Sequence, residues 1–253
     1  MTEALADSAA LVHDPGALRD RARADGALLL RGLLDPALVE RVCALALYAA
    51  AEHGWLHPDH PWSDGIVRPG LALGAYDEDW LAVQRAVVVD SSWTKLGEAP
   101  PLLDALAKVL GAPPSSGDGS VLRVFSPAGD AHTTPPHQEL AFTGGPPTGW
   151  AAWIPLVTCP LSRGGLAVMR GSHRAGLLPH AGDRCTRVPE GGPWACADYE
   201  PGDVLLVHCQ TLHRALPNRD PAGRLRLSAD FRFRPDQREL HAFDVVREPV
   251  QPE

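Results

Sequence analysis

The first half of the chain carries apolar residues at helical spacing. Asp14 and Asp35 each stand directly before a proline, and an N-cap aspartate followed by proline at the first helical position marks a helix start. The apolar residues that follow predict helices to Asp25 and to about Ala51. A short apolar strand, Ala27–Leu30, is predicted between the two helices.

Helical spacing returns twice before the middle of the chain. Residues 79–88 form one such stretch, and residues 101–110 form another that ends at Gly111. A connector rich in Pro, Ser and Gly follows at 112–119. We therefore expect a helical flank over residues 1–119.

From residue 120 onward the apolar runs become short and are separated by Gly and Pro. This pattern is typical of an antiparallel sandwich of the jelly-roll kind. The 24 glycines and 25 prolines of the 253-residue chain also indicate many turns and loops. The predicted strands are Val121–Phe125, Trp150–Val157, Leu166–Arg170, Asp203–Cys209 and Arg224–Phe233. The predicted fold class is mainly β with flanking α, a double-stranded β-helix (jelly-roll, cupin-like) core with N-terminal helices. One domain spans 1–253, with the core at 120–235 and a C-terminal tail at 236–253.

The last predicted strand has a clear two-faced pattern. One face carries polar side chains and the other carries apolar ones, as expected for a strand with one buried side. The polar face has Arg224, Arg226, Ser228 and Asp230, and the apolar face has Leu225, Leu227, Ala229 and Phe231.

Residues 52–79 show no periodicity and are rich in aromatic residues, glycine and proline. Long loops inside a compact domain are usually functional or disordered, so this segment is predicted to contribute to a substrate lid. His57 and His60 lie within it. No carboxylate pattern accompanies them, and we interpret them as surface histidines.

Composition and charge narrow the class of protein further. The formal net charge is −8 and no basic run stands out, which argues against nucleic-acid binding. The N-terminal residues lack a signal-peptide pattern, and no apolar run approaches the length of a membrane span. The five cysteines are scattered, without a C-x-x-C pair, as is usual for reduced thiols. The expectation is a cytoplasmic enzyme with a small-molecule substrate.

The triplet His137-Gln138-Glu139 is the candidate for chemistry. A histidine and a carboxylate two residues apart on an extended segment point to the same side. His213, on a distant strand, can complete a set of two histidines and one carboxylate. Such a set with open coordination positions is the ligand pattern of non-haem Fe(II) oxygenases.

The surroundings of this triplet resemble the phytanoyl-CoA dioxygenase family of Fe(II)- and 2-oxoglutarate-dependent oxygenases. The likeness extends over nearly the whole chain, from an N-terminal segment at 26–42 to the strand-rich part at about 120–235. The motifs that carry it are Pro136–Glu139, Trp153–Leu156, Gly164–Leu166, Gly171–His173, Pro201–Leu206, Thr211–His213, Pro217-Asn218, Arg224 and Ser228.

The resemblance implies a role for each matching residue. His137, Glu139 and His213 would be the iron ligands and the catalytic centre. Arg224, eleven residues after His213, would bind the distal carboxylate of 2-oxoglutarate, because a guanidinium grips a carboxylate with two hydrogen bonds. Arg226 remains the alternative anchor.

The resemblance also implies that Trp153 and Gln138 line the co-substrate pocket. The cofactors would be Fe(II), 2-oxoglutarate as co-substrate, and O2. The reaction would be hydroxylation of a small metabolite or natural-product intermediate, with release of succinate and CO2. The alternative function is a metal-binding cupin-like module or isomerase that does not use 2-oxoglutarate and needs no arginine in its pocket.

One position departs from the family pattern, which usually has aspartate where this chain has Glu139. Related halogenases have a small residue there, so the presence of a carboxylate predicts oxygenation rather than halogenation. Two other histidines are expected to lie outside the ligand set. His208 precedes His213 by an odd number of residues, which would place it on the opposite face of one strand, and His173 belongs to a Gly-Ser-His turn.

Overall fold

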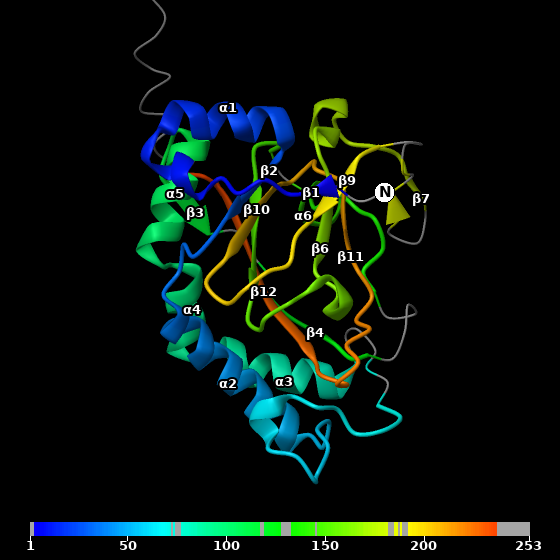
Figure 1. Ribbon diagram of the computed structural model, residues 1–253. Coiled ribbons are helices and arrows are strands. Elements are labelled where there is room, and N and C mark those ends of the chain that lie inside the picture. The colour runs from blue at the N-terminus through cyan, green and yellow to red at the C-terminus, as the bar shows by residue number, and fades with distance from the viewer. Residues whose placement is uncertain are drawn as a thin grey trace, which may run out of the picture.

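The computed structural model shows two β-sheets with a layer of helices against the larger one (Figure 1). It describes residues 3–236 apart from 72, 74–76, 117–118, 128–132, 145, 182–184, 187 and 189–191. The predicted fold class is confirmed, with two open sheets rather than a closed barrel. The predicted tail at 236–253 lies outside the described residues except for Asp236.

The larger sheet has six strands, and β5 lies near its centre between β10 and β12. Both neighbours run antiparallel to it, so that Trp153 pairs with Leu205 on one side and with Asp230 on the other. The strands in sheet order are β2 (Ala27–Leu30), β10 (Val204–His208), β5 (Trp150–Pro155), β12 (Arg226–Pro235) and β3 (Pro114–Ser116), with β4 (Val121–Phe125) also paired to β12. The six predicted strands fall in this sheet or in the second one, and each matches to within two residues at each end.

The second sheet has four short strands and lies on the other side of the larger sheet (Figure 1). Three of its strands are too short to be recognised from alternation in the sequence. The order is β1 (Glu3–Ala4), β9 (Trp194–Cys196), β6 (Leu166–Met169) and β11 (His213–Ala215); a separate pair joins β7 (His180–Ala181) to β8 (Cys185–Thr186).

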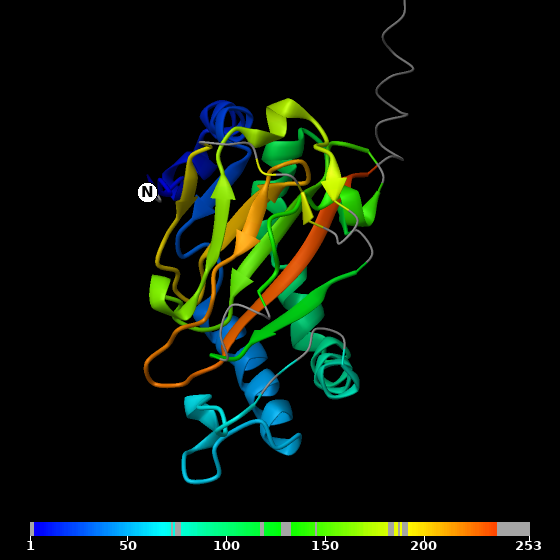
Figure 2. The ribbon, with the colours of Figure 1, turned by 90° about the vertical axis from the view of Figure 1, so that its right-hand side faces the viewer.

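The helices cover one face of the larger sheet and leave its inner face to the second sheet (Figure 2). As predicted, Asp14 caps α1, by accepting hydrogen bonds from the first-turn amides. Gly26 ends the helix in the left-handed conformation. The α-helices are α1 (Pro15–Asp25), α2 (Pro36–Glu52), α3 (Glu78–Val88), α4 (Ser91–Gly97), α5 (Pro100–Leu110) and α6 (Leu140–Thr143). Short 3-10 helices span Ala9–His13, Trp62–Asp64, Leu161–Arg163 and Ser172–Ala175.

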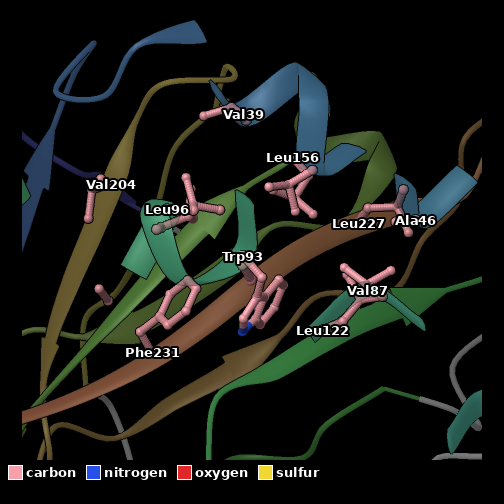
Figure 3. Packing of buried hydrophobic residues seen from close by; sticks show 14 of the residues in the cluster. Val39, Ala46, Val87, Trp93, Leu96, Leu122, Leu156, Val204, Leu227 and Phe231 are labelled. Atoms are coloured by element: carbon pink, nitrogen blue, oxygen red, sulfur yellow. The ribbon is translucent and has the colours of Figure 1, made fainter. Parts of the chain in front are cut away.

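The main hydrophobic core fills the space between these helices and the outer face of β12 and its neighbours (Figure 3). Trp93 of α4 packs on Phe231 of β12 with ring centroids 4.9 Å apart. Burying one large apolar side chain contributes about 1.5–3 kcal/mol. Gly97 allows this close approach, because a Cβ there would lie 2.5 Å from the Phe231 ring. Leu225, Leu227 and Ala229 belong to the same core, so the apolar face of β12 is confirmed.

The described part of residues 52–79 packs against the chain just before β12. Val67 donates a backbone hydrogen bond to Gly223, and Leu225 donates one to Gly65. Trp55 is buried in the core. Among the described residues of this segment, none lines either of the two cavities that contain Glu139. No helix in the described part of the chain is both long and apolar enough to cross a membrane.

Candidate functional site

The inner face of β12 forms one wall of the candidate site. Because strand side chains alternate, the residues opposite the core all point to this face. They are Arg226, Ser228, Asp230, Arg232 and Arg234, and three of them line the cavity that contains His137, Glu139 and His213.

Two of the three candidate ligands are held together by the backbone. His137 and His213 form an isolated antiparallel bridge, with amide-to-carbonyl hydrogen bonds of 2.9 and 3.0 Å in the two directions. Their ring centroids lie 4.1 Å apart, and both side chains are buried. This backbone bridge holds residues separated by 76 positions side by side.

In each imidazole, a hydrogen bond at Nδ1 fixes the orientation of the ring. Nδ1 of His137 lies 2.9 Å from the carbonyl oxygen of Pro135, and Nδ1 of His213 lies 2.9 Å from that of Thr211. A carbonyl oxygen can only accept, so each Nδ1 carries the proton and each Nε2 lone pair is free to bind a metal. Both Nε2 atoms face the carboxylate of Glu139, whose Oε2 is 3.7 Å from His137 and 3.9 Å from His213.

Glu139 reaches this position by a different route from the one predicted. Its backbone is helical (φ −58°, ψ −37°), because it stands at the start of α6, so the pair with His137 does not lie on a regular strand. The turn brings the carboxylate back toward the imidazoles. Arg232 of β12 donates a hydrogen bond from Nε to Oε1, which leaves Oε2 facing the two histidines.

The protonation states suit metal binding. Burial alone would raise the pKa of the Glu139 carboxyl, but the neighbouring His137 and the positive charge of Arg232 outweigh it and hold that pKa well below its usual range. Burial lowers the pKa of His213 to about 3, with repulsion from His137 adding to the effect. At neutral pH the site therefore presents one carboxylate and a neutral His213 imidazole, which are the forms that metals bind.

Arg226 lines the same cavity and is almost completely buried. Its Nε donates to the carbonyl of Gly164 and its Nη1 to the hydroxyl of Ser228. The guanidinium carbon stands 4.0 Å from the ring centroid of Phe125 and 5.9 Å from that of Trp153. Burial lowers the pKa of Arg226 to about 10, so the side chain remains a cation at neutral pH.

Arg224 lies outside this cavity, although the sequence predicted that it would face the co-substrate pocket. It precedes the first residue of β12, and its side chain is 42% exposed. Its Nε donates to the Asp220 carboxylate at 2.7 Å. Because it is engaged in a surface ion pair and does not line the cavity, the structure separates the two arginines that the sequence left as alternatives.

Of the two other predicted pocket residues, Trp153 lines the cavity and Gln138 does not. The Gln138 side chain, between the two candidate ligands His137 and Glu139, is fully buried. It donates to the carbonyls of Gly176 and Gln210 and accepts from the amide of Leu178. Gln138 thus links the loop that contains Gly176 and Leu178 to the turn that contains Gln210.

His208 and His173 lie outside the candidate ligand set, as expected, and face each other at a centroid distance of 5.3 Å. The reasoning for His208 needs correction. β10 ends at His208 and the chain turns before β11 begins at His213, so the two histidines do not share a strand.

Sequence reasoning did not single out two further charged residues of the cavity. Arg123 of β4 donates to Asp230 at 2.8 Å across the β4–β12 pair, and Arg232 contacts Glu139. The alternation that places Arg226 and Asp230 on one face would have reached Arg232 at the next step, so this signal was present in the sequence.

The donor set fits a divalent first-row metal. One ligand atom from each of His137, Glu139 and His213 lies within 4.8 Å of the others, and all three residues are buried. Two imidazoles and one carboxylate on one side of a cavity leave the other coordination positions for exogenous ligands. The fold and the site together define a mononuclear non-haem iron oxygenase of the cupin-like class.

The chain belongs to the phytanoyl-CoA dioxygenase family, whose model matches residues 22–225. It is therefore an Fe(II)- and 2-oxoglutarate-dependent oxygenase, with iron and 2-oxoglutarate as its cofactors. A similar curated protein is the 1-deoxypentalenic acid 11-beta-hydroxylase of Streptomyces arenae, 30% identical over 250 residues that cover 91% of this chain and 84% of the relative.

Solved structures share the fold at lower identity. The epimerase SnoN, crystallised with Fe3+, alpha ketoglutarate and a nogalamycin compound, superposes with a TM-score of 0.65 at 21% identity, covering 88% of this chain and 85% of SnoN. The alpha ketoglutarate dependent carbocyclase SnoK, from nogalamycin biosynthesis, covers 98% of both chains with a TM-score of 0.59 at 19% identity.

Proposed function

We propose that this enzyme hydroxylates a small natural-product intermediate, at an iron centre held by His137, Glu139 and His213. The observation that carries the proposal is one cavity that is lined both by this donor set and by the buried cation of Arg226. Bound Fe(II), together with 2-oxoglutarate, supplies the activation of O2 that inserts oxygen into a C–H bond and releases succinate and CO2. The chain itself binds, orients and shields the reactants.

The co-substrate anchor in this proposal is Arg226 rather than Arg224. A buried guanidinium pairs strongly with a carboxylate, because little water competes for the hydrogen bonds. The aromatic rings of Phe125 and Trp153 hold the guanidinium plane in place. A metal-binding module that does not use a keto acid has no need for this cation, so Arg226 favours the oxygenase over that alternative.

Glu139 has a second consequence for the product. Its carboxylate would occupy the coordination position that a halide requires, so the proposed outcome is oxygenation. Arg232 supports this role by holding Oε1 and leaving Oε2 turned toward the two imidazoles. The substrate assignment rests on the relatives, among which are hydroxylases of 1-deoxypentalenic acid from two Streptomyces species.

The test is anaerobic loading with Fe(II) and 2-oxoglutarate, followed by O2 and a library of natural-product intermediates. The expected result is succinate formation that rises above the background for a true substrate. Under 18O2 in chloride buffer, the product should gain labelled oxygen. A chlorinated product would contradict the role given to Glu139, and no succinate with any metal loading would contradict the proposed function.

A further inference from the structure

A second, larger cavity lies on the outer side of Glu139. It encloses about 440 Å³, within the size range of pockets that hold small organic ligands. Glu139 and Arg232 line both this chamber and the inner cavity, so the two spaces meet at the carboxylate that faces His137 and His213. A molecule in the chamber would therefore lie directly beside the candidate metal centre.

The walls of the chamber combine apolar and polar surface in similar amounts. They are built by α6, residues 146–149, β4, β5 and β12, and their apolar side chains include Val121, Leu140, Phe142, Pro146, Trp150 and Phe233. Phe142 is the most informative of them. Its ring meets the ring of His137 edge to face at 5.3 Å, yet 43% of the residue is exposed. The exposed part of the Phe142 ring adds apolar surface to the chamber beside the candidate metal centre.

Among the described residues that line the chamber, positive charge exceeds negative charge. Glu139 is matched by Arg232, and the Arg234 guanidinium is a further positive charge. No carboxylate in the described part of the chain forms an ion pair with Arg234, although the whole protein carries a net charge of −8. Arg234 follows Arg232 by two residues on β12, so it points to the same face roughly 7 Å further along the strand.

We infer that this chamber binds the primary substrate, and that the substrate is an organic acid with a compact apolar body whose carboxylate is bound by Arg234. That the ligand is a substrate rests on the proposed function, but its binding to the chamber can be measured separately. The apolar side chains of the wall bind the body of such a molecule, and the guanidinium selects the acid over a neutral analogue. The body then lies against Phe142, next to the iron site.

The experiment uses the full chain loaded with Fe(II) and saturating 2-oxoglutarate under anaerobic conditions, so that Arg226 is occupied. Two probes with the same apolar body are titrated by calorimetry: adamantane-1-carboxylate and 1-adamantanemethanol. The acid should bind about tenfold more tightly than the alcohol, as expected for a partly exposed charge-assisted pair. Arg234→Gln should bring that ratio close to one.

Two further variants separate the parts of the inference. Arg85→Gln removes an exposed arginine of α3 that lines neither cavity, and it should keep the acid preference. Phe142→Ala should weaken both probes by a similar factor, because it removes apolar contact and leaves the charge. Thermal unfolding of each variant verifies that the fold is retained.

Three results would overturn the inference: equal binding of acid and alcohol to the unchanged protein, an acid preference that survives Arg234→Gln, or no binding of either probe. Succinate formation from 2-oxoglutarate and O2 is measured in parallel with the same library of natural-product intermediates. Succinate formation without charge-selective binding refutes the substrate class and leaves the oxygenase standing. Charge-selective binding without succinate under any loading refutes the proposed function and leaves the acid-binding chamber.

Discussion

The choice between Arg226 and Arg224 can be decided by measuring 2-oxoglutarate binding. Replacing Arg226 by Gln removes one half of a buried charge pair, which typically costs about 2–5 kcal/mol. At about 1.4 kcal/mol for each factor of ten, the dissociation constant of 2-oxoglutarate should rise roughly thirty-fold to several thousand-fold. Arg224→Gln breaks an ion pair in which the arginine is 42% exposed, so the same constant should change by less than about twofold.

The assay is anaerobic calorimetric titration of 2-oxoglutarate into the Fe(II)-loaded protein. Arg226 also bonds to Gly164 and Ser228, so thermal unfolding and iron content are measured to separate lost binding from lost structure. Arg226→Lys keeps the charge without the planar fork and should give an intermediate loss. The reasoning fails if Arg224→Gln weakens binding more than Arg226→Gln does, or if Arg226→Gln has little effect on a folded, iron-loaded protein.

Three more outcomes are expected. His213→Ala should lower iron content from about one ion per chain, and full iron with full turnover would exclude His213 as a ligand. Arg232→Gln should weaken Fe(II) binding about 10–100-fold in a chelator competition, with Arg232→Lys retaining part of the affinity; an unchanged affinity would remove Arg232 from the support of Glu139. Burial lowers the pKa of His208 to about 4. As the pH falls, the imidazole is therefore protonated in the unfolded chain before it is protonated in the folded protein. The free energy of unfolding should therefore decrease from about pH 6.5 to about pH 4, less steeply in His208→Gln, and identical slopes would contradict a neutral, half-buried His208.

Local signals predicted the elements of the fold well. Asp14 with its following proline and Gly26 specify both ends of α1 through hydrogen bonds within a few residues. Helix α4 was missed because its seven residues are too few for a periodic pattern, although Asp90 caps it as Asp14 caps α1. Strand β11, three residues long, was missed for the same reason.

The site was predictable where it depended on residue type and uncertain where it depended on the path of the chain. His137, Glu139 and His213 come together as expected, but Glu139 does so through a helical turn that alternation could not foresee. The strand pattern put Arg224 and Arg226 on one face. The structure differs because β12 begins at Arg226, and Asp220 binds Arg224 in the preceding loop. The contact of Arg232 with Glu139 joins residues 93 positions apart, a separation over which local pattern carries no information.

Strand β12 limits how this enzyme can diversify in evolution. Its inner face carries the polar row from Arg226 to Arg234, and its outer face supplies Leu227 and Phe231 to the core. Insertion or deletion of a single residue inside the strand would exchange the two faces from that point onward, burying charges and exposing the core. A change in the length of β12 should therefore disrupt both the hydrophobic core and the candidate site. New substrate preferences can arise at lower cost in α6 and residues 146–149, which border the chamber but contribute little to the core.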